Sequence, residues 1–435
     1  MKQINLFSRL AFLLAMVVFV IPSCSNNDSE SQLEEQKDIT QEEQEEKVEP
    51  KPRLDISLDN IEKQLAWKNV DFAFRLLQSA DKSIKNNDKL VLSPFSASMA
   101  LSMLTNGAGG DSKQELLEAL GYNANELATM NRLNKRLLEE LPELDNTTTV
   151  GIANSLWLNK GITVTGEFKD VLTTDYSAEV NTLDYSQVES VGIINEWCKK
   201  KTNNLIKNFL EDLRPNDCFI LLNALYFNGE WKTPFVPEKT NKAIFTAQND
   251  EQQDVEMMHK FSSYMYVKEN GYAMVELPYG NSAYSMFILM PDTGIGISEC
   301  IESITAEGWM DSMNEMKFKL ISVKLPKFKT EAKLSMGGTL HVMGVEKVFL
   351  PDSANLTALS GDKSYLSGMM QAINISVDEY GTEAAAVTGN TTEIEGGESG
   401  NVEVIDFHVN RSFLFFVKEK STDTFLFIGK MADVE

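Results

Sequence analysis

The chain has 435 residues, of which 43% are hydrophobic and 9% aromatic, so it can bury a large core and wholesale disorder is excluded. Its 64 acidic and 40 basic residues give a formal net charge of −24 at pH 7. That charge repels phosphate backbones over most of the surface, which argues against nucleic acid as a partner.

Residues 1–23 have the layout of a signal peptide. Lys2 and Arg9 flank the start of an apolar run at 11–21, which is shorter than the roughly 20 residues a membrane-spanning helix needs. Ser23 stands directly before Cys24, and this resembles the lipobox of bacterial lipoproteins, whose cysteine is lipidated. We therefore expect a lipid anchor on Cys24 that places the protein in the bacterial cell envelope, exposed at the outer membrane. An ordinary secretory signal with an incidental Cys24 is the alternative.

Residues 24–55 are predicted to form a disordered acidic tether. Positions 24–50 carry ten acidic residues against Lys37 and Lys47, with few apolar side chains. Such a composition cannot offset the entropy cost of ordering the chain. Acids soon after a lipidated cysteine also resemble surface-export signals of some diderm bacteria, and a plain tether is the alternative.

From residue 56 to 435 the composition is that of one folded body. No Pro/Gly/Ser-rich linker interrupts it before 389–401. Three cysteines remain in this part, Cys198, Cys218 and Cys300. Their odd number and their spacing fit neither a disulfide framework nor a zinc site, so we expect packed thiols.

Helical signals dominate the first half of this body. Phe72, Leu76 and Ala80 recur at four-residue spacing, which predicts one face of a helix. A second helix, carrying several leucines, is expected to begin at 109–111, with Gln114 as the partner in a capping box.

Strand signals dominate the second half. Nearly continuous apolar runs cover 219–227, interrupted by Asn223, and 286–290, while 413–417 and 425–428 are predicted to form a hairpin. Apolar runs without alternation are typical of strands covered on both faces. Helices first and strands later in one body indicate an α+β domain.

The sequence lacks the local motifs of an enzyme. It has three histidines, His259, His341 and His408, and none lies in a nucleophile-elbow or metal-ligand spacing. There is also no P-loop and no complete dinucleotide fingerprint. We therefore expect no enzyme, no cofactor and no metal.

The stretch 376–405 has an unusual pattern for a folded domain. Even positions from 382 to 392 are all small and uncharged, whereas Glu383, Glu393 and Glu395 fall on odd positions. Because alternate side chains of a strand face opposite sides, this segment can be a loop in one state and a strand in another. Gly381 would supply the backbone freedom of a hinge. A floppy surface loop is the alternative.

Five motifs, in chain order, resemble those of the serpins, and the resemblance covers roughly residues 56–435. They are LSPFS at 92–96, NALYFNGEW at 223–231, LPK at 325–327, DEYGTEAAA at 378–386 and FHVNRSFLFFV at 407–417. The resemblance implies an α+β serpin fold, with helices packed around three β-sheets and an exposed reactive-centre loop at about 379–404. That loop can insert into the central sheet, and the protein is expected to be a monomer.

By this resemblance, the protein is an irreversible suicide inhibitor of serine or cysteine endopeptidases. The target's nucleophile attacks the loop, and insertion then traps the covalent acyl complex. One rival is a non-inhibitory serpin that is cleaved as a substrate or serves as a binding module. A second is a lipoprotein hydrolase with a dispersed active site.

The resemblance also assigns roles to particular residues. The loop hinge consists of Glu379, Gly381, Thr382, Glu383, Ala384, Ala385, Ala386 and Val387. The region where the sheet opens consists of Ser93, Ser96, Asn223, Trp231, Lys327 and Gln371. Glu379 and Lys327 are expected to pair where insertion begins, under Trp231. Gln371 replaces the histidine usual in the polar cluster, so the cluster keeps a donor and an acceptor but loses a titrating group.

The scissile bond has two candidates. Counting forward from Gly381 by the family's usual span gives Glu395–Gly396, which we prefer, and counting back from Phe407 gives Glu398–Ser399. Both place an acidic residue in the main pocket of the target, which suits a glutamate-preferring protease. Cleavage after Ile394 would instead suit elastase-like or papain-like targets.

Overall fold

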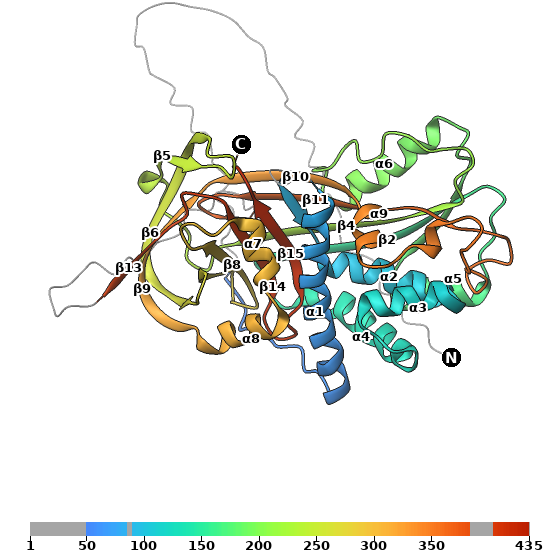
Figure 1. The fold of residues 1–435 in the computed structure, drawn as a ribbon, viewed down its shortest axis with the longest axis horizontal. Coiled ribbons are helices and arrows are strands. Elements are labelled where there is room, and N and C mark those ends of the chain that lie inside the picture. The colour runs from blue at the N-terminus through green and yellow to red at the C-terminus, as the bar shows by residue number, and fades with distance from the viewer. Residues whose placement is uncertain (1–48, 85–88, 383–402, 435) are drawn as a thin grey trace, which may run out of the picture. The chain divides into compact units, whose positions relative to one another are not determined.

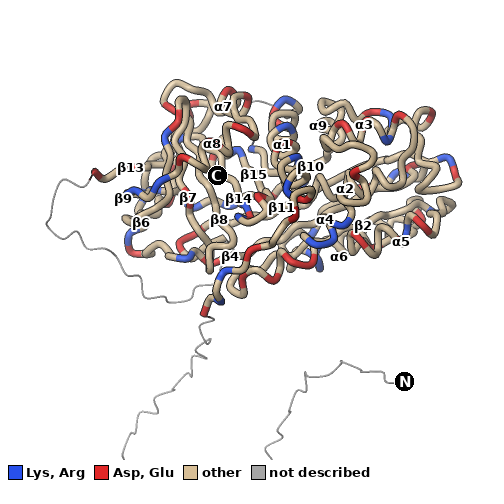
Figure 2. The backbone as a smooth tube through the Cα atoms, turned by 90° about the horizontal axis from the view of Figure 1, so that it is seen from below, with Lys and Arg blue, Asp and Glu red and all other residues tan. Residues whose placement is uncertain are grey.

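The computed structural model describes residues 49–84, 89–382 and 403–434 (Figure 1). These residues belong to one unit, which runs from Lys47 to Glu435. The signal peptide, Cys24 and nearly all of the acidic tether lie outside the described residues, so those predictions stay predictions. Acidic and basic residues are interspersed along the described chain (Figure 2).

Helices dominate the first half of the body, as predicted. The α-helices are α1 (Asn60–Ser83), α2 (Pro94–Gly107), α3 (Gly110–Leu120), α4 (Leu127–Glu140), α5 (Gly166–Asp175), α6 (Glu189–Lys201), α7 (Ile297–Ser303), α8 (Ala306–Glu315) and α9 (Gly337–Val342). Short 3-10 turns lie at η1 (Ala124–Glu126), η2 (Leu141–Glu143), η3 (Pro237–Lys239) and η4 (Lys347–Phe349). Within the described ranges, none of the helices combines the length and the apolar character needed to cross a membrane.

Both predicted helices form, but one predicted cap is wrong. In α1 the Phe72, Leu76 and Ala80 side chains are fully buried. Helix α3 begins at Gly110 without a side-chain cap, and Gln114 donates to Glu118 instead of closing a capping box. The local pattern failed because the N-cap residue, Gly109, donates its backbone N–H to the distant Asn355 carbonyl at 2.9 Å.

The central sheet has six strands in the order β10-β11-β12-β4-β2-β3, and β11 also pairs directly with β4. The strands are β2 (Thr148–Asn159), β3 (Glu179–Leu183), β4 (Phe219–Glu230), β10 (Phe328–Ser335), β11 (Leu366–Val377) and β12 (Gly381–Thr382). The predicted apolar run at 219–227 is one uninterrupted strand, β4.

The second sheet has nine strands in the order β1-β15-β14-β8-β7-β6-β9-β13, with β5 also paired to β6. They are β1 (Leu90–Leu92), β5 (Asn241–Thr246), β6 (Gln252–Lys268), β7 (Tyr272–Pro278), β8 (Tyr284–Pro291), β9 (Lys317–Pro326), β13 (Val404–His408), β14 (Phe413–Glu419) and β15 (Phe425–Met431). The predicted hairpin is confirmed, since β14 and β15 pair antiparallel.

The described residues thus form two hydrogen-bonded sheets where three were expected. The cause is β6, which is 17 residues long. Its last residues pair with β7, while the rest of the strand pairs with β5 and β9. One strand therefore joins what would otherwise be two separate sheets.

Helices cover the central sheet on both faces (Figure 1). Every residue of α2 except Asn106 is buried, which is typical of a helix enclosed on all sides. A second apolar cluster packs α6 against β2, where the Trp157 and Trp197 rings meet edge to face at 6.0 Å. This double cover explains why β4 shows no alternation of polar and apolar residues.

Candidate functional site

The central sheet is closed at one end and opened at the other. Strands β4 and β11 run parallel and pair directly from Phe219–Leu366 to Leu225–Ile373. Beyond that point β12 lies between them and pairs with both: Thr382 is opposite Gly229 of β4 and Val377 of β11. Residues of the predicted hinge therefore occupy the opening between the two central strands.

A tight turn carries the chain from β11 into β12. The Asp378 side chain accepts hydrogen bonds from the N–H groups of Tyr380 and Gly381, at 2.8 and 3.2 Å. A Cβ on Gly381 would lie 2.1 Å from the carbonyl oxygen of Gly229. The glycine is needed here for space, because it does not have a positive φ. The hinge role of Gly381 stays a prediction.

Thr382 contacts Tyr279, which packs against Phe227 and Trp231, and we call these three aromatic side chains the hinge socket. Thr382 has no exposed surface, and its hydroxyl lies 2.6 Å from the Tyr279 hydroxyl. The Tyr279 ring stacks on Trp231 at 4.5 Å and meets Phe227 edge to face at 5.0 Å. Burial raises the pKa of Tyr279, so the phenol stays neutral and can donate or accept.

The segment after β4 holds the turn through three hydrogen bonds. Trp231 donates its backbone N–H to the Tyr380 carbonyl at 2.8 Å and its indole N–H to the Asp378 carbonyl at 2.9 Å. Phe235 donates its N–H to the Glu379 carbonyl at 2.8 Å. Trp231 therefore packs against the hinge and also donates hydrogen bonds to two backbone carbonyls of the turn.

Glu379 and Lys327 lie together beside this turn. The Lys327 ammonium is 3.0 Å from Glu379 Oε2, and the Thr240 hydroxyl donates to Glu379 Oε1 at 2.7 Å. Burial favours the neutral carboxyl, but the hydrogen bond from Thr240 and the charge of Lys327 outweigh it, so the pKa of Glu379 is lowered. The same pairing overcomes burial at Lys327 and raises its pKa.

We expect acid to weaken this anchor of the hinge. A lowered folded-state pKa contributes stability above the unfolded value of about 4.3, and this stability is lost as the pH falls through the folded-state pKa. Glu379→Gln should lower the free energy of unfolding at pH 7 by about 1–3 kcal/mol and reduce the loss of stability below pH 5. Urea unfolding at a series of pH values measures both effects.

The matched control is Glu256→Gln, because Glu256 is the exposed second partner of Lys327, at 3.5 Å. It should behave nearly as the unmodified chain, since exposed pairs contribute little. Identical pH profiles for Glu379→Gln and the unmodified chain would contradict the assignment.

A polar cluster lies under the closed part of the sheet. Gln371 of β11 stands opposite Asn223 of β4. Its Oε1 accepts from the Ser93 N–H at 3.1 Å, and its Nε2 donates to the Ser93 carbonyl at 2.7 Å. The Ser93 hydroxyl caps α2 by accepting from the Ser96 N–H at 3.1 Å. The four predicted residues are thus brought together, and Gln371 uses both its donor and its acceptor.

This cluster has a member that the sequence reasoning missed. Asn154 of β2 accepts from the Asn223 side chain at 2.6 Å and donates to the Tyr176 carbonyl at 2.9 Å. Among the described residues, Ser96 Oγ and Asn223 Oδ1 are buried without a hydrogen-bond partner. Such atoms destabilise the closed sheet, because a buried polar atom left unpaired costs free energy.

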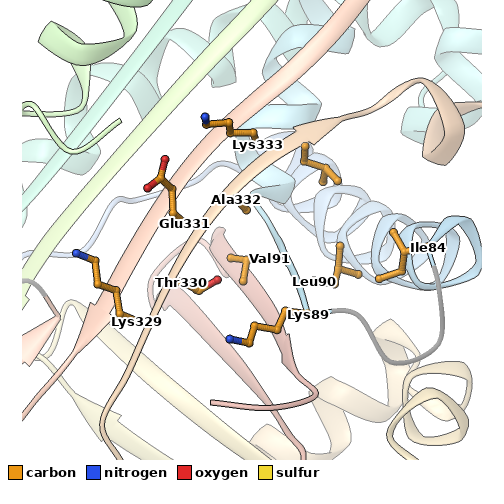
Figure 3. A pocket seen from close by; sticks show the side chains of 10 residues that line it. Ile84, Lys89, Leu90, Val91, Lys329, Thr330, Glu331, Ala332 and Lys333 are labelled. Atoms are coloured by element: carbon orange, nitrogen blue, oxygen red, sulfur yellow. The ribbon is translucent and has the colours of Figure 1, made fainter. Parts of the chain in front are cut away.

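One cavity of the described residues can be compared with the hydrolase alternative. A cavity of about 420 Å³ lies between β1 and β10, and Lys329, Glu331 and Lys333 point away from Val91 while Thr330 points toward it (Figure 3). Its lining contains no histidine or cysteine. His259 Nε2 lies 3.1 Å from Ser322 Oγ, which is a base–nucleophile distance, but neither residue lines this cavity.

The three cysteines of the described residues are free thiols, as predicted. Cys198 and Cys300 are buried, Cys218 is half-buried, and burial raises the pKa of the Cys198 thiol to about 12. Within the described ranges no group of His, Cys, Asp and Glu side chains is arranged to hold a metal ion. The rest of the predicted hinge, from Glu383 to Val387, and both candidate scissile bonds lie outside the described residues.

Comparisons with known proteins agree with this geometry. The serpin family profile, described as serine protease inhibitor, matches residues 68–434. Iripin-3 of Ixodes ricinus is 33% identical over 377 residues, covering 85% of this chain and 94% of the relative, and human serpin B3 is 29% identical over 391 residues, covering 85% and 99%. The native thermophilic serpin tengpin superimposes with a TM-score of 0.79 at 28% identity, covering 89% of this chain and 98% of tengpin. The predicted serpin fold is confirmed, and the chain belongs to the serpin family of protease inhibitors.

Proposed function

We propose that this serpin is an irreversible suicide inhibitor of serine or cysteine proteases. The observation that carries the proposal is the position of β12 between β4 and β11. Gly381 and Thr382 of β12 belong to the predicted reactive-centre loop, which covers about 379–404. A loop whose first strand residues already lie in the sheet is placed to continue inserting once it is cut.

The chemistry starts at the proposed scissile bond, Glu395–Gly396. The target's serine or cysteine attacks the Glu395 carbonyl, the peptide bond breaks, and Gly396 leaves with a new amino group. The acyl-enzyme then stays attached to the segment that begins at Thr382. Each inserted residue adds ladder hydrogen bonds worth about 1 kcal/mol net, so insertion can drive an irreversible step.

The burial of Thr382 supports the interpretation that the small, uncharged even positions of the loop face inward when it forms a strand. Thr382 is the first of the small, uncharged even positions, and its side chain points into the hinge socket with no exposed surface. If the alternation of a strand continues, the later even positions also face inward, where large or charged side chains would not fit.

The decisive experiment incubates the purified chain with a panel of proteases that includes a glutamate-preferring enzyme. We expect a complex that survives SDS, together with a released C-terminal peptide whose mass shows that it begins at Gly396. A start at Ser399 would move the scissile bond to Glu398–Ser399. Cleavage without a complex would support the substrate or binding-module alternative. Intrinsic turnover of an ester, abolished by His259→Ala, would support the hydrolase.

The lipid anchor on Cys24 stays a prediction of the sequence. It would hold this inhibitor at the outer membrane. The same panel of proteases identifies the target.

A further inference from the structure

A second cavity, of about 240 Å³, lies beside the hinge socket. It is enclosed by the segment after β4, by β6 and β7, and by the start of β9, and its lining includes Lys232, Met265, Pro278, Phe318 and Lys420. Its volume is slightly below the range of sites for drug-sized ligands, so any ligand must be small.

The charges in this cavity leave one cation without an acidic partner. The buried carboxylate of Glu276 pairs with Lys420 and also accepts from the Ser285 hydroxyl at 2.7 Å. The charge of Lys420 is therefore balanced. The Lys232 ammonium donates to the Ser282 hydroxyl at 2.9 Å, and no ion pair joins it to a carboxylate of the described residues. Since an ammonium has three donors, Lys232 can still bind an anion.

Part of the lining of the cavity is apolar, and one of its side chains is largely exposed. Phe318 is 73% exposed, which is unusual for a phenylalanine. Met265 stands directly opposite Phe318 on the neighbouring strand, and Pro278 lies on β7. An apolar group bound against these side chains would remove them from water.

We propose that this cavity binds a small amphipathic anion, an aromatic or alkyl carboxylate. Its carboxylate would accept hydrogen bonds from the Lys232 ammonium, and its apolar part would cover Phe318 and Met265. The charge complementarity at Lys232 selects an anion over a neutral or cationic ligand of the same shape.

Two residues that line the cavity are direct chain neighbours of residues in the hinge socket. Lys232 directly follows Trp231, Pro278 directly precedes Tyr279, and the Lys232 N–H donates to the Pro278 carbonyl at 2.9 Å. A ligand that holds Lys232 in place therefore stabilises the segments that carry both stacked rings of the socket. Hydrogen exchange at the amides of residues 231–235 should slow when the ligand is bound. Unchanged exchange at saturation would overturn this coupling.

The binding experiment titrates the purified full chain with 2-naphthoate and follows fluorescence and heat. We expect saturable binding of one molecule per chain, and binding at least tenfold weaker for the uncharged 2-naphthalenemethanol. Lys232→Met should weaken 2-naphthoate binding at least tenfold, whereas Lys232→Arg should largely retain it.

The matched control is Lys329→Met, because Lys329 is an exposed lysine that lines the other cavity. It should bind 2-naphthoate as the unmodified chain does, and thermal unfolding confirms that each variant is folded. Absence of saturable binding, or equal affinity of Lys232→Met and the unmodified chain, would overturn the site. The result does not depend on protease inhibition, so the two proposals can fail separately.

Discussion

Thr382→Arg is expected to abolish the SDS-stable protease complex while cleavage of the reactive-centre loop continues. Thr382 is fully buried, with its hydroxyl 2.6 Å from that of Tyr279, and the Tyr279 ring stacks on Trp231. An arginine there would bury a charge without a carboxylate partner, which costs several kcal/mol. The hinge would stay outside the sheet, and insertion could not begin.

The measurement is the number of protease molecules trapped per chain, read from denaturing gels, beside the rate of loop cleavage. Thr382→Ser is the matched control, because it keeps the hydroxyl and the small volume and should trap as the unmodified chain does. A normal yield of complex from Thr382→Arg would rule out insertion through β12.

Gln371→Ala is expected to lower the free energy of unfolding by about 2–4 kcal/mol. The substitution removes both hydrogen bonds to Ser93, which lies fully buried at the start of α2. The buried Ser93 N–H would be left unpaired, at about 1–3 kcal/mol, and the Ser93 carbonyl would lose one of two hydrogen bonds, at about 1 kcal/mol, because it still accepts from the Ala97 N–H at 3.0 Å. Urea unfolding measures the loss, and Gln114→Ala, on the exposed surface of α3, serves as the control with a change near zero.

Gln371→His gives the more specific readout. A neutral imidazole can donate and accept, but an imidazolium cannot accept from the Ser93 N–H. Burial lowers the folded-state pKa of such a histidine. Its contribution to the stability of the fold is therefore complete above the unfolded pKa of about 6.5 and is lost as the pH falls through the folded-state pKa. The free energy of unfolding should therefore fall more between pH 8 and pH 5 for Gln371→His than for the unmodified chain. An equal fall in the two proteins would contradict the role given to Gln371.

Patterns within single elements predicted the fold well. The four-residue spacing of Phe72, Leu76 and Ala80 identified a buried helix face, and the unalternating run at 219–227 identified a strand covered on both sides. Contacts distant in sequence were not predictable in this way. The residue before α3, Gly109, is held by a backbone hydrogen bond to Asn355, and the joining of two sheets depends on the length of β6.

The site shows the same division. The motifs led to Ser93, Asn223, Trp231, Lys327, Gln371 and Glu379, and the structure places these residues in two groups around β4 and β11. Tyr279 and Asn154 were missed. An asparagine inside the apolar stretch 148–159 was a usable signal, since a buried amide needs a partner. Tyr279 offered no signal, because only the fold brings the end of β7 to the hinge.

The parallel pairing of β4 and β11 gives any insertion a fixed direction. Seven residue pairs join the two strands, and Leu225–Ile373 stands nearest the opening, followed by Ala224–Ala372 and then Asn223–Gln371. A loop that inserts from Thr382 onward separates the two strands one residue pair at a time. It separates two apolar pairs before it reaches Asn223, which is bonded to Asn154, and Gln371, which is bonded to Ser93. The slow step of the proposed insertion would then fall at the third pair, so the hydrogen bonds of its two amide side chains would set how fast insertion proceeds relative to release of the protease.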